Sequence, residues 1–126
     1  MKVHHIGVAV NNIDDAVKYW EKLGFKIHHR EHVQSQSIEA AFLSLGNVWL
    51  ELVQPVGEKT PLTNFLQKRG EGLHHICFEV EDIRKESGSA QMITEPVKGF
   101  GDSEIAFAYP NEFGRVLVEF VQQPPY

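Results

Sequence analysis

An internal repeat constrains the fold of this chain more than any other feature of its sequence. Residues 3–10 (VHHIGVAV) resemble residues 73–80 (LHHICFEV) at an offset of 70. Residues 50–55 (LELVQP) resemble residues 118–124 (VEFVQQP) at an offset of 68. Two independent matches at nearly one offset indicate a duplicated unit, so the chain is expected to fold as two similar halves.

Each half has the pattern β-α-β-β-β. Residues 3–10 alternate, with Ile6, Val8 and Val10 on one face, which is typical of a strand. Asn12 or Asp14 can cap a following helix, whose apolar residues recur at helical spacing. The expected strands of the first half cover 3–10, 25–32, 37–45 and 47–54, and its helix covers 14–23. The second half is expected to have a weaker helix over 82–91, interrupted by Gly88, and strands over 74–80, 104–109 and 115–121.

Together these elements predict a single α+β domain over residues 1–126. Its two tandem βαβββ modules, about 1–56 and 73–126, are joined by a short helical linker over 60–68.

Each module has one histidine near its start and one glutamate near its end. His5 and Glu51 are 46 residues apart, and His75 and Glu119 are 44 residues apart. The histidines share a strand face with small residues, and the glutamates alternate with apolar residues. An ionised carboxylate that faces a cavity is costly unless a cation or hydrogen-bond donors compensate. The matched pairs therefore predict that His5, Glu51, His75 and Glu119 bind one divalent metal ion.

The donor types do not choose the metal. Mixed imidazole and carboxylate ligation suits zinc, nickel, cobalt, manganese or iron. The other histidines serve as internal comparisons. His4 and His74 fall on the opposite strand phase and are expected to pack or meet solvent, while His28, His29 and His32 have no repeat partner and are expected on an exposed strand. Cys77 is expected to be a small buried residue near the cavity.

Composition excludes several classes of protein. The net charge is −5 without a basic stripe, which argues against binding to nucleic acid. No apolar run approaches a membrane span, and the first residues resemble neither a signal nor a transit peptide. A single cysteine excludes an intrachain disulfide, which fits a cytoplasmic location.

The chain resembles the vicinal oxygen chelate superfamily, which includes glyoxalase I, bleomycin-resistance proteins and extradiol dioxygenases. The motifs HHIGVAV, LELVQP, LHHICFEV and VLVEF match the ligand positions of that superfamily at His5, Glu51, His75 and Glu119. Within it, residues 42–47 (FLSLGN) and 65–76 (FLQKRGEGLHHI) are most similar to methylmalonyl-CoA epimerases. The sequence departs from that group at 107–111 (FAYPN) and at Gly114-Arg115.

The resemblance implies paired modules that form an open barrel around a metal. It also implies a metal-dependent epimerase or isomerase that removes the α-proton of an acyl-CoA thioester. Glu119 is the expected base on one face of the substrate. Glu39 is a candidate for the other face, although aligning through Phe42 and Gly46 places Ala40 at that position.

Two other functions remain open from the sequence. One is a lyase of the glyoxalase I type that acts on a glutathione adduct, or another metal-dependent enzyme of the superfamily. The other is a metal-free binding protein of the bleomycin-resistance type. A homodimer is expected because family members commonly pair modules across a dimer. Basic residues are expected to contact a CoA group at the rim, with Lys59, Lys68, Arg69, Lys98 and Arg115 as candidates.

Overall fold

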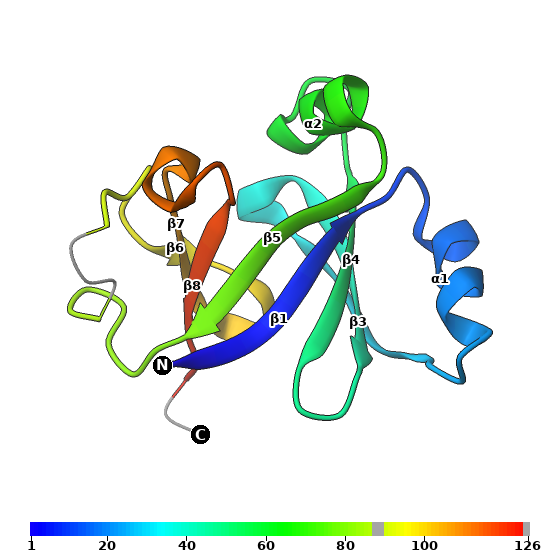
Figure 1. The fold of residues 1–126 in the computed structure, drawn as a ribbon, viewed down its shortest axis with the longest axis horizontal. Helices are drawn as coiled ribbons and strands as arrows, with labels where there is room; N and C mark the ends of the chain where they lie inside the picture. The colour runs from blue at the N-terminus through cyan, green and yellow to red at the C-terminus, as the bar shows by residue number, and fades with distance from the viewer. Residues whose placement is uncertain (87–89, 125–126) are drawn as a thin grey trace.

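The computed structural model describes residues 1–86 and 90–124. Within these residues the chain forms one eight-stranded sheet and two α-helices (Figure 1). The strands are β1 (Lys2–Ala9), β2 (Ile27–Val33), β3 (Ile38–Ser44), β4 (Trp49–Pro55), β5 (Gly72–Glu79), β6 (Val97–Lys98), β7 (Glu104–Ala108) and β8 (Val118–Gln122). The helices are α1 (Ile13–Glu21) and α2 (Pro61–Arg69), and the short 3₁₀ helices are η1 (Gln34–Gln36), η2 (Phe100–Asp102) and η3 (Pro110–Phe113).

The strand order places the two halves of the chain on the two halves of one sheet. The order is β2-β3-β4-β1-β5-β8-β7-β6, with β1 and β5 antiparallel at the centre. In the first half β1 is parallel to β4, and in the second half β5 is parallel to β8. Figure 1 shows β1 and β5 side by side in the middle of the molecule. The two halves of the sheet are therefore related by an approximate twofold axis, as the sequence repeat predicts.

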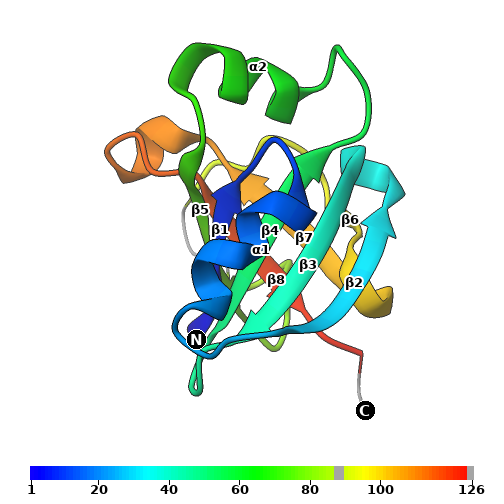
Figure 2. The ribbon, with the colours of Figure 1, turned by 90° about the vertical axis from the view of Figure 1, so that its right-hand side faces the viewer.

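The sheet is curled into a half-barrel, whose curvature can be followed in Figure 2. Contacts join the region of β2 to the region of β6, although these strands are the two edges of the sheet. The Ser35 hydroxyl donates to the carbonyl of Lys98 at 2.6 Å, and the amide of Gly101 donates to Glu31 at 3.0 Å. The predicted α+β fold with an open, barrel-like cavity is confirmed.

Equivalent glutamine side chains make the same hydrogen bond in both halves of the chain. The Gln54 carboxamide oxygen accepts a hydrogen bond from the amide of Ile13 at 2.9 Å. The Gln122 oxygen accepts one from the amide of Ile83 at 2.8 Å. Each glutamine lies three residues after a predicted metal ligand, so these bonds tie the ligand-bearing strand to the chain that follows the first strand of each module.

Helix α1 covers the outer face of the first half of the sheet. The Asn12 side chain accepts from the amide of Asp15 at 2.9 Å and so caps the helix, as predicted. Ile13, Ala16 and Val17 are buried against apolar side chains of β3 and β4. This packing leaves the opposite, concave face of the sheet free for the predicted ligands.

The second half differs from its predicted form. Residues 83–86 form turns in place of the start of the helix expected over 82–91, and residues 87–89 of that helix lie outside the described part of the chain. The last strand begins at Val118 rather than at 115, because Gly114 and Arg115 both have positive φ and end the preceding turn. Over residues 1–86 and 90–124, no helix has the length and apolar character needed to cross a membrane.

Candidate metal centre

The four predicted ligands lie on the four central strands of the sheet. Glu51 is on β4, His5 on β1, His75 on β5 and Glu119 on β8. The strand register arranges them in two rows. Gly7 lies between Glu51 and His75 in one row, and Cys77 lies between Glu119 and His5 in the other. Each row thus consists of a glutamate, a small residue and a histidine, and the two rows are related by the approximate twofold axis.

The ligand atoms converge on one point. His5 Nε2 and His75 Nε2 are 3.0 Å apart. Each of these two nitrogens lies 3.1 Å from Glu51 Oε1. The distance to Glu119 Oε1 is 3.1 Å from His5 Nε2 and 3.2 Å from His75 Nε2. All four side chains are buried, with exposed fractions of 0% for His5, 4% for Glu51, 6% for His75 and 3% for Glu119. The structure therefore brings together the whole predicted ligand set.

This arrangement fits a divalent ion. Nitrogen and oxygen ligands bind such ions at about 2.1 Å, and neighbouring donors of an octahedral ion are then about 3 Å apart. The observed separations of 3.0 to 3.2 Å agree with this spacing. Two buried carboxylates also carry the charge that one divalent ion neutralises.

The ionisation of the cluster depends strongly on its neighbours. Burial by itself lowers the pKa of His5, but the carboxylates of Glu51 and Glu119 outweigh burial and raise that pKa to about 10. The pKa of His75 is raised for the same reason. Burial raises the pKa of each glutamate, but the two histidines outweigh it and lower the pKa of both Glu51 and Glu119. Without an ion, the raised pKa values of the histidines and the lowered pKa values of the glutamates favour positive imidazole charge beside the two carboxylates, and a divalent ion can replace that positive charge.

Gly7 makes room for His75. A Cβ atom built on Gly7 would overlap the imidazole ring of His75, and the three atoms nearest to it are Cε1, Nδ1 and Nε2 of that ring. Only glycine therefore allows the ring to lie over the strand beside Glu51. Small residues are expected on the histidine face from the sequence, and the structure gives the contact that requires one.

The cluster opens into a cavity of about 380 Å³. Glu51, His75 and Glu119 line it, whereas His5 is covered by Phe42 and Phe100, whose ring centroids lie 5.7 and 5.6 Å from its own. The remaining wall is mainly apolar: Val33, Ile38, Val53, Pro61, Leu62, Ile93, Phe100, Ile105, Phe107 and Leu117, with Ser35, Gln36, His74 and Thr94 as further polar members. An apolar cavity with a few convergent polar groups is typical of a small-molecule site.

Glu39, the candidate second base, lies away from this cavity. It shares a face of β3 with Ala41, which packs beneath α1, whereas Ala40 and Phe42 face the concave side. The Glu39 carboxylate lies 3.6 Å from both Arg30 Nε and His32 Nδ1. The structure therefore places Ala40 on the side of the metal cluster and Glu39 among exposed charges.

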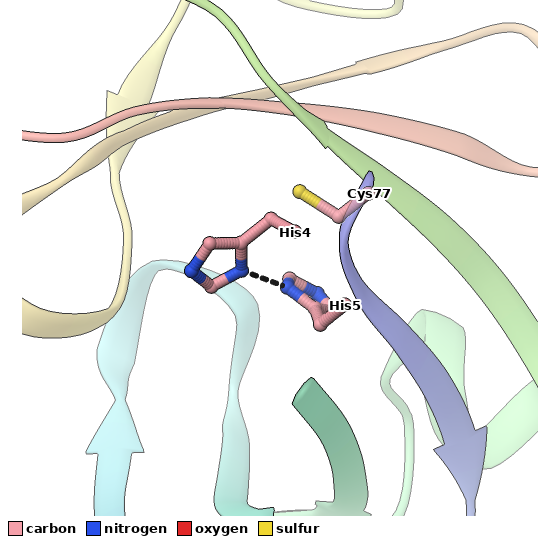
Figure 3. Close-up of side chains that lie close together, drawn as sticks. All are labelled: His4, His5 and Cys77. Atoms are coloured by element: carbon pink, nitrogen blue, oxygen red, sulfur yellow. Dashed lines mark hydrogen bonds between the residues drawn. The ribbon is translucent and has the colours of Figure 1, made fainter. Parts of the chain in front are cut away.

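The histidines that precede the ligands have an arrangement that was not predicted from the sequence. His4 Nδ1 lies 2.8 Å from His5 Nδ1, and Figure 3 marks this contact with a dashed line. His74 Nδ1 likewise lies 2.8 Å from His75 Nδ1. The expectation that His4 and His74 pack or meet solvent was therefore incomplete. The sequence feature that could have indicated this contact is the repetition of the whole His-His pair at an offset of 70. His28, His29 and His32 are exposed as predicted, and Cys77 is buried.

Comparison with known proteins agrees with the fold. Residues 4–107 match the Glyoxalase/Bleomycin resistance protein/Dioxygenase superfamily. The uncharacterized protein YqjC of Bacillus subtilis is 37% identical over 128 residues, covering 96% of this chain and 91% of that protein. The ethylmalonyl-CoA/methylmalonyl-CoA epimerase of Cereibacter sphaeroides is 32% identical over 130 residues, covering 96% and 97%. A variant methylmalonyl-CoA epimerase of Streptomyces coelicolor, solved with 2-nitronate-propionyl-CoA, has a TM-score of 0.92 at 28% identity, covering 98% and 97%.

The chain therefore belongs to the Glyoxalase/Bleomycin resistance protein/Dioxygenase superfamily, as its motifs predicted. Within this superfamily its relatives and structural neighbours include methylmalonyl-CoA epimerases. The prediction that the chain is an enzyme is thereby confirmed.

Proposed function

We propose that this protein is a metal-dependent epimerase that removes and returns the α-proton of an acyl-CoA thioester, with methylmalonyl-CoA as the first candidate substrate. The observation that carries the proposal is the buried cluster of two histidines and two glutamates in the wall of an apolar cavity. A related structure contains methylmalonyl-CoA, which supports the choice of substrate class.

The metal site has a clear chemical use in this reaction. We propose His5, Glu51, His75 and Glu119 as the ligands. A bound divalent ion supplies a Lewis acid that stabilises the negative charge that develops on the thioester oxygen as the proton leaves. The apolar walls of the cavity exclude water and so strengthen the electrostatic effect of the site.

Glu119 is the proposed base on one face of the substrate. It lines the cavity, and its two histidine neighbours lower the pKa of its carboxyl group below the usual range, after offsetting the effect of burial. The carboxylate is therefore ionised at neutral pH and can accept a proton. Glu51 occupies the equivalent position in the other module and also lines the cavity, which makes it a candidate for the opposite face.

The CoA portion of the substrate is expected to remain outside the cavity. Among the described residues that line the cavity, none is lysine or arginine, so the wall offers no cation to the phosphates of CoA. Arg69 at the end of α2 is the best-placed candidate at the rim. Its guanidinium lies over the ring of Phe65, which contacts the cavity residue His74 with a centroid distance of 4.7 Å.

Deuterium exchange tests the proposal directly. The protein loaded with cobalt or zinc is incubated with (2R)- or (2S)-methylmalonyl-CoA in deuterated water, and C2 is followed by NMR. Exchange at C2 with formation of the other epimer is the expected result, and protein treated with a chelator serves as the control. Absence of exchange, together with turnover of the glutathione hemithioacetal of methylglyoxal, would instead identify a lyase of the glyoxalase I type.

Two further properties belong to the proposal. One divalent ion per chain is expected from elemental analysis after mild purification, and His75→Ala should abolish this binding. A homodimer is the expected state in solution. All four proposed ligands come from one chain, so the metal site itself does not require a second copy.

A further inference from the structure

The strand pairing of β1 and β5 contains two irregularities, one in front of each ligand histidine. Val3 pairs with Phe78 and His5 with Cys77, so His4 is an extra residue on β1. Gly7 pairs with His75 and Val8 with Leu73, so His74 is an extra residue on β5. An extra residue of this kind is a β-bulge, which re-aims side chains near functional sites. The bulges explain how adjacent histidines, which would point to opposite faces of a regular strand, come within 2.8 Å of each other.

The contact between His4 and His5 restricts their protons. Two Nδ1 atoms at 2.8 Å form a hydrogen bond only if one carries a proton and the other does not. His5 directs Nε2 at the other three ligands. A histidine that binds a metal through Nε2 carries its proton on Nδ1. His5 must then donate to His4, and the proton of a neutral His4 must lie on Nε2.

The far side of His4 faces Gln123. The nitrogen of the Gln123 carboxamide lies 3.1 Å from His4 Nε2, and the ring of Phe100 stacks on His4 at 5.3 Å and fixes its plane. A protonated Nε2 needs an acceptor, which the carboxamide nitrogen is not. The two ends of a carboxamide have nearly the same shape, so a half-turn of this group presents its oxygen instead.

We propose that Gln123 and His4 form an outer hydrogen-bonded chain that holds His5 in its metal-binding tautomer, with the carboxamide oxygen of Gln123 facing His4 in the metal-bound protein. Both are positioning residues, because they act through His5. The inference rests on the proposed metal site and does not depend on the substrate. His74 has the same contact with His75, but it lies against Phe65 and lines the cavity. His4 is therefore the better residue for a test.

The first experiment measures zinc affinity by competition with a chromophoric chelator. His4→Phe keeps an aromatic ring on Phe100 but removes the acceptor, and is expected to weaken zinc binding by about 10- to 100-fold. Gln123→Glu offers only acceptors and should bind zinc at least as tightly as the unmodified protein. Gln123→Met has a similar shape without a polar end and should bind several-fold more weakly. His32→Phe, which removes an exposed imidazole on β2, is the matched control and should leave the affinity unchanged.

The second experiment observes the protons themselves. Long-range ¹H–¹⁵N correlation spectra of the zinc-loaded protein distinguish the two imidazole tautomers, and His4 is expected to carry its proton on Nε2. A proton on His4 Nδ1, or equal losses of zinc affinity for Gln123→Glu and Gln123→Met, would overturn the proposal, as would absence of zinc binding by the unmodified protein. Neither experiment uses an acyl-CoA, so their outcome is separate from that of the exchange assay.

Discussion

Replacement of Gly7 by alanine should disrupt the metal centre through one methyl group. The backbone of Gly7 is not in the left-handed region, so the main chain itself accepts alanine. The obstacle is the ring of His75, which occupies the place of the new Cβ. His75 is only 6% exposed and packs against Phe107 at a centroid distance of 6.1 Å. Its ring therefore has to leave the cluster, or the two central strands have to separate.

The size of the effect follows from what the methyl group meets. Insertion of an extra carbon into a well-packed site costs about 1–3 kcal/mol. In a His75→Ala background the ring is absent, and the same change should be neutral or should stabilise by about 0.4–1 kcal/mol, because alanine restricts the unfolded chain more than glycine does. The two substitutions should therefore be coupled by about 1–4 kcal/mol.

Urea unfolding of the four proteins of this double-mutant cycle, in the presence of a chelator, measures the coupling without any contribution from metal. Tryptophan fluorescence reports the transition through Trp20 and Trp49. The matched control is the same glycine substitution in a His5→Ala background, where the overlap with His75 persists and the cost should remain. An equal cost of Gly7→Ala with and without His75, within about 0.5 kcal/mol, would refute the argument.

Three further predictions concern chemistry, charge and assembly. Glu119→Gln should keep its metal and lose most C2 exchange, since an amide oxygen can coordinate but cannot accept the proton. Glu51→Gln should stop net epimerisation but leave deuterium exchange at C2 of one epimer. Glu39→Gln should change neither the epimerisation rate nor the exchange rate. Loss of epimerisation in Glu39→Gln would show that β3 supplies the second base. Zinc binding at pH 7.5 should release protons, because the pKa of His5 is raised to about 10 and that of His75 is also raised in the metal-free protein. Zinc affinity should therefore rise with pH until the pKa of His5 is passed. Calorimetry in two buffers of different ionisation enthalpy measures the proton release, and a value near zero contradicts the assigned charges. Light scattering should give twice the chain mass of 14.3 kDa, and a value near the chain mass at micromolar concentration rules out the dimer.

The cluster of two histidines and two glutamates could be predicted from the sequence because the duplication gives each residue an internal partner. One histidine or glutamate on an alternating strand carries little information. The recurrence of His5 with Glu51 as His75 with Glu119 selects four residues out of many polar ones. Strand alternation then assigns all four to the face opposite α1, and the structure places them there.

The bulges could not be predicted in the same way. Residues 3–10 alternate without interruption, so nothing local marks His4 as an extra residue. The bulge becomes apparent only when β1 is paired with β5, about 70 residues further along the chain. Phe100, which packs on His4 and His5, was also missed, because it lies in a segment without a counterpart in the repeat.

The environment of the metal centre is much less symmetric than the centre itself. His5 is closed off by Phe42 and Phe100, whereas its counterpart His75 faces the cavity together with both glutamates. A substrate bound in the cavity would meet His75 and the two glutamates, Glu51 and Glu119, which are related by the approximate twofold axis. Epimerisation requires proton removal on one face of a planar intermediate and proton return on the other, and two carboxylates related in this way meet that requirement. We therefore expect that the symmetry of the sheet supplies the two opposed bases, and that the closure around His5 sets the side from which the substrate reaches them.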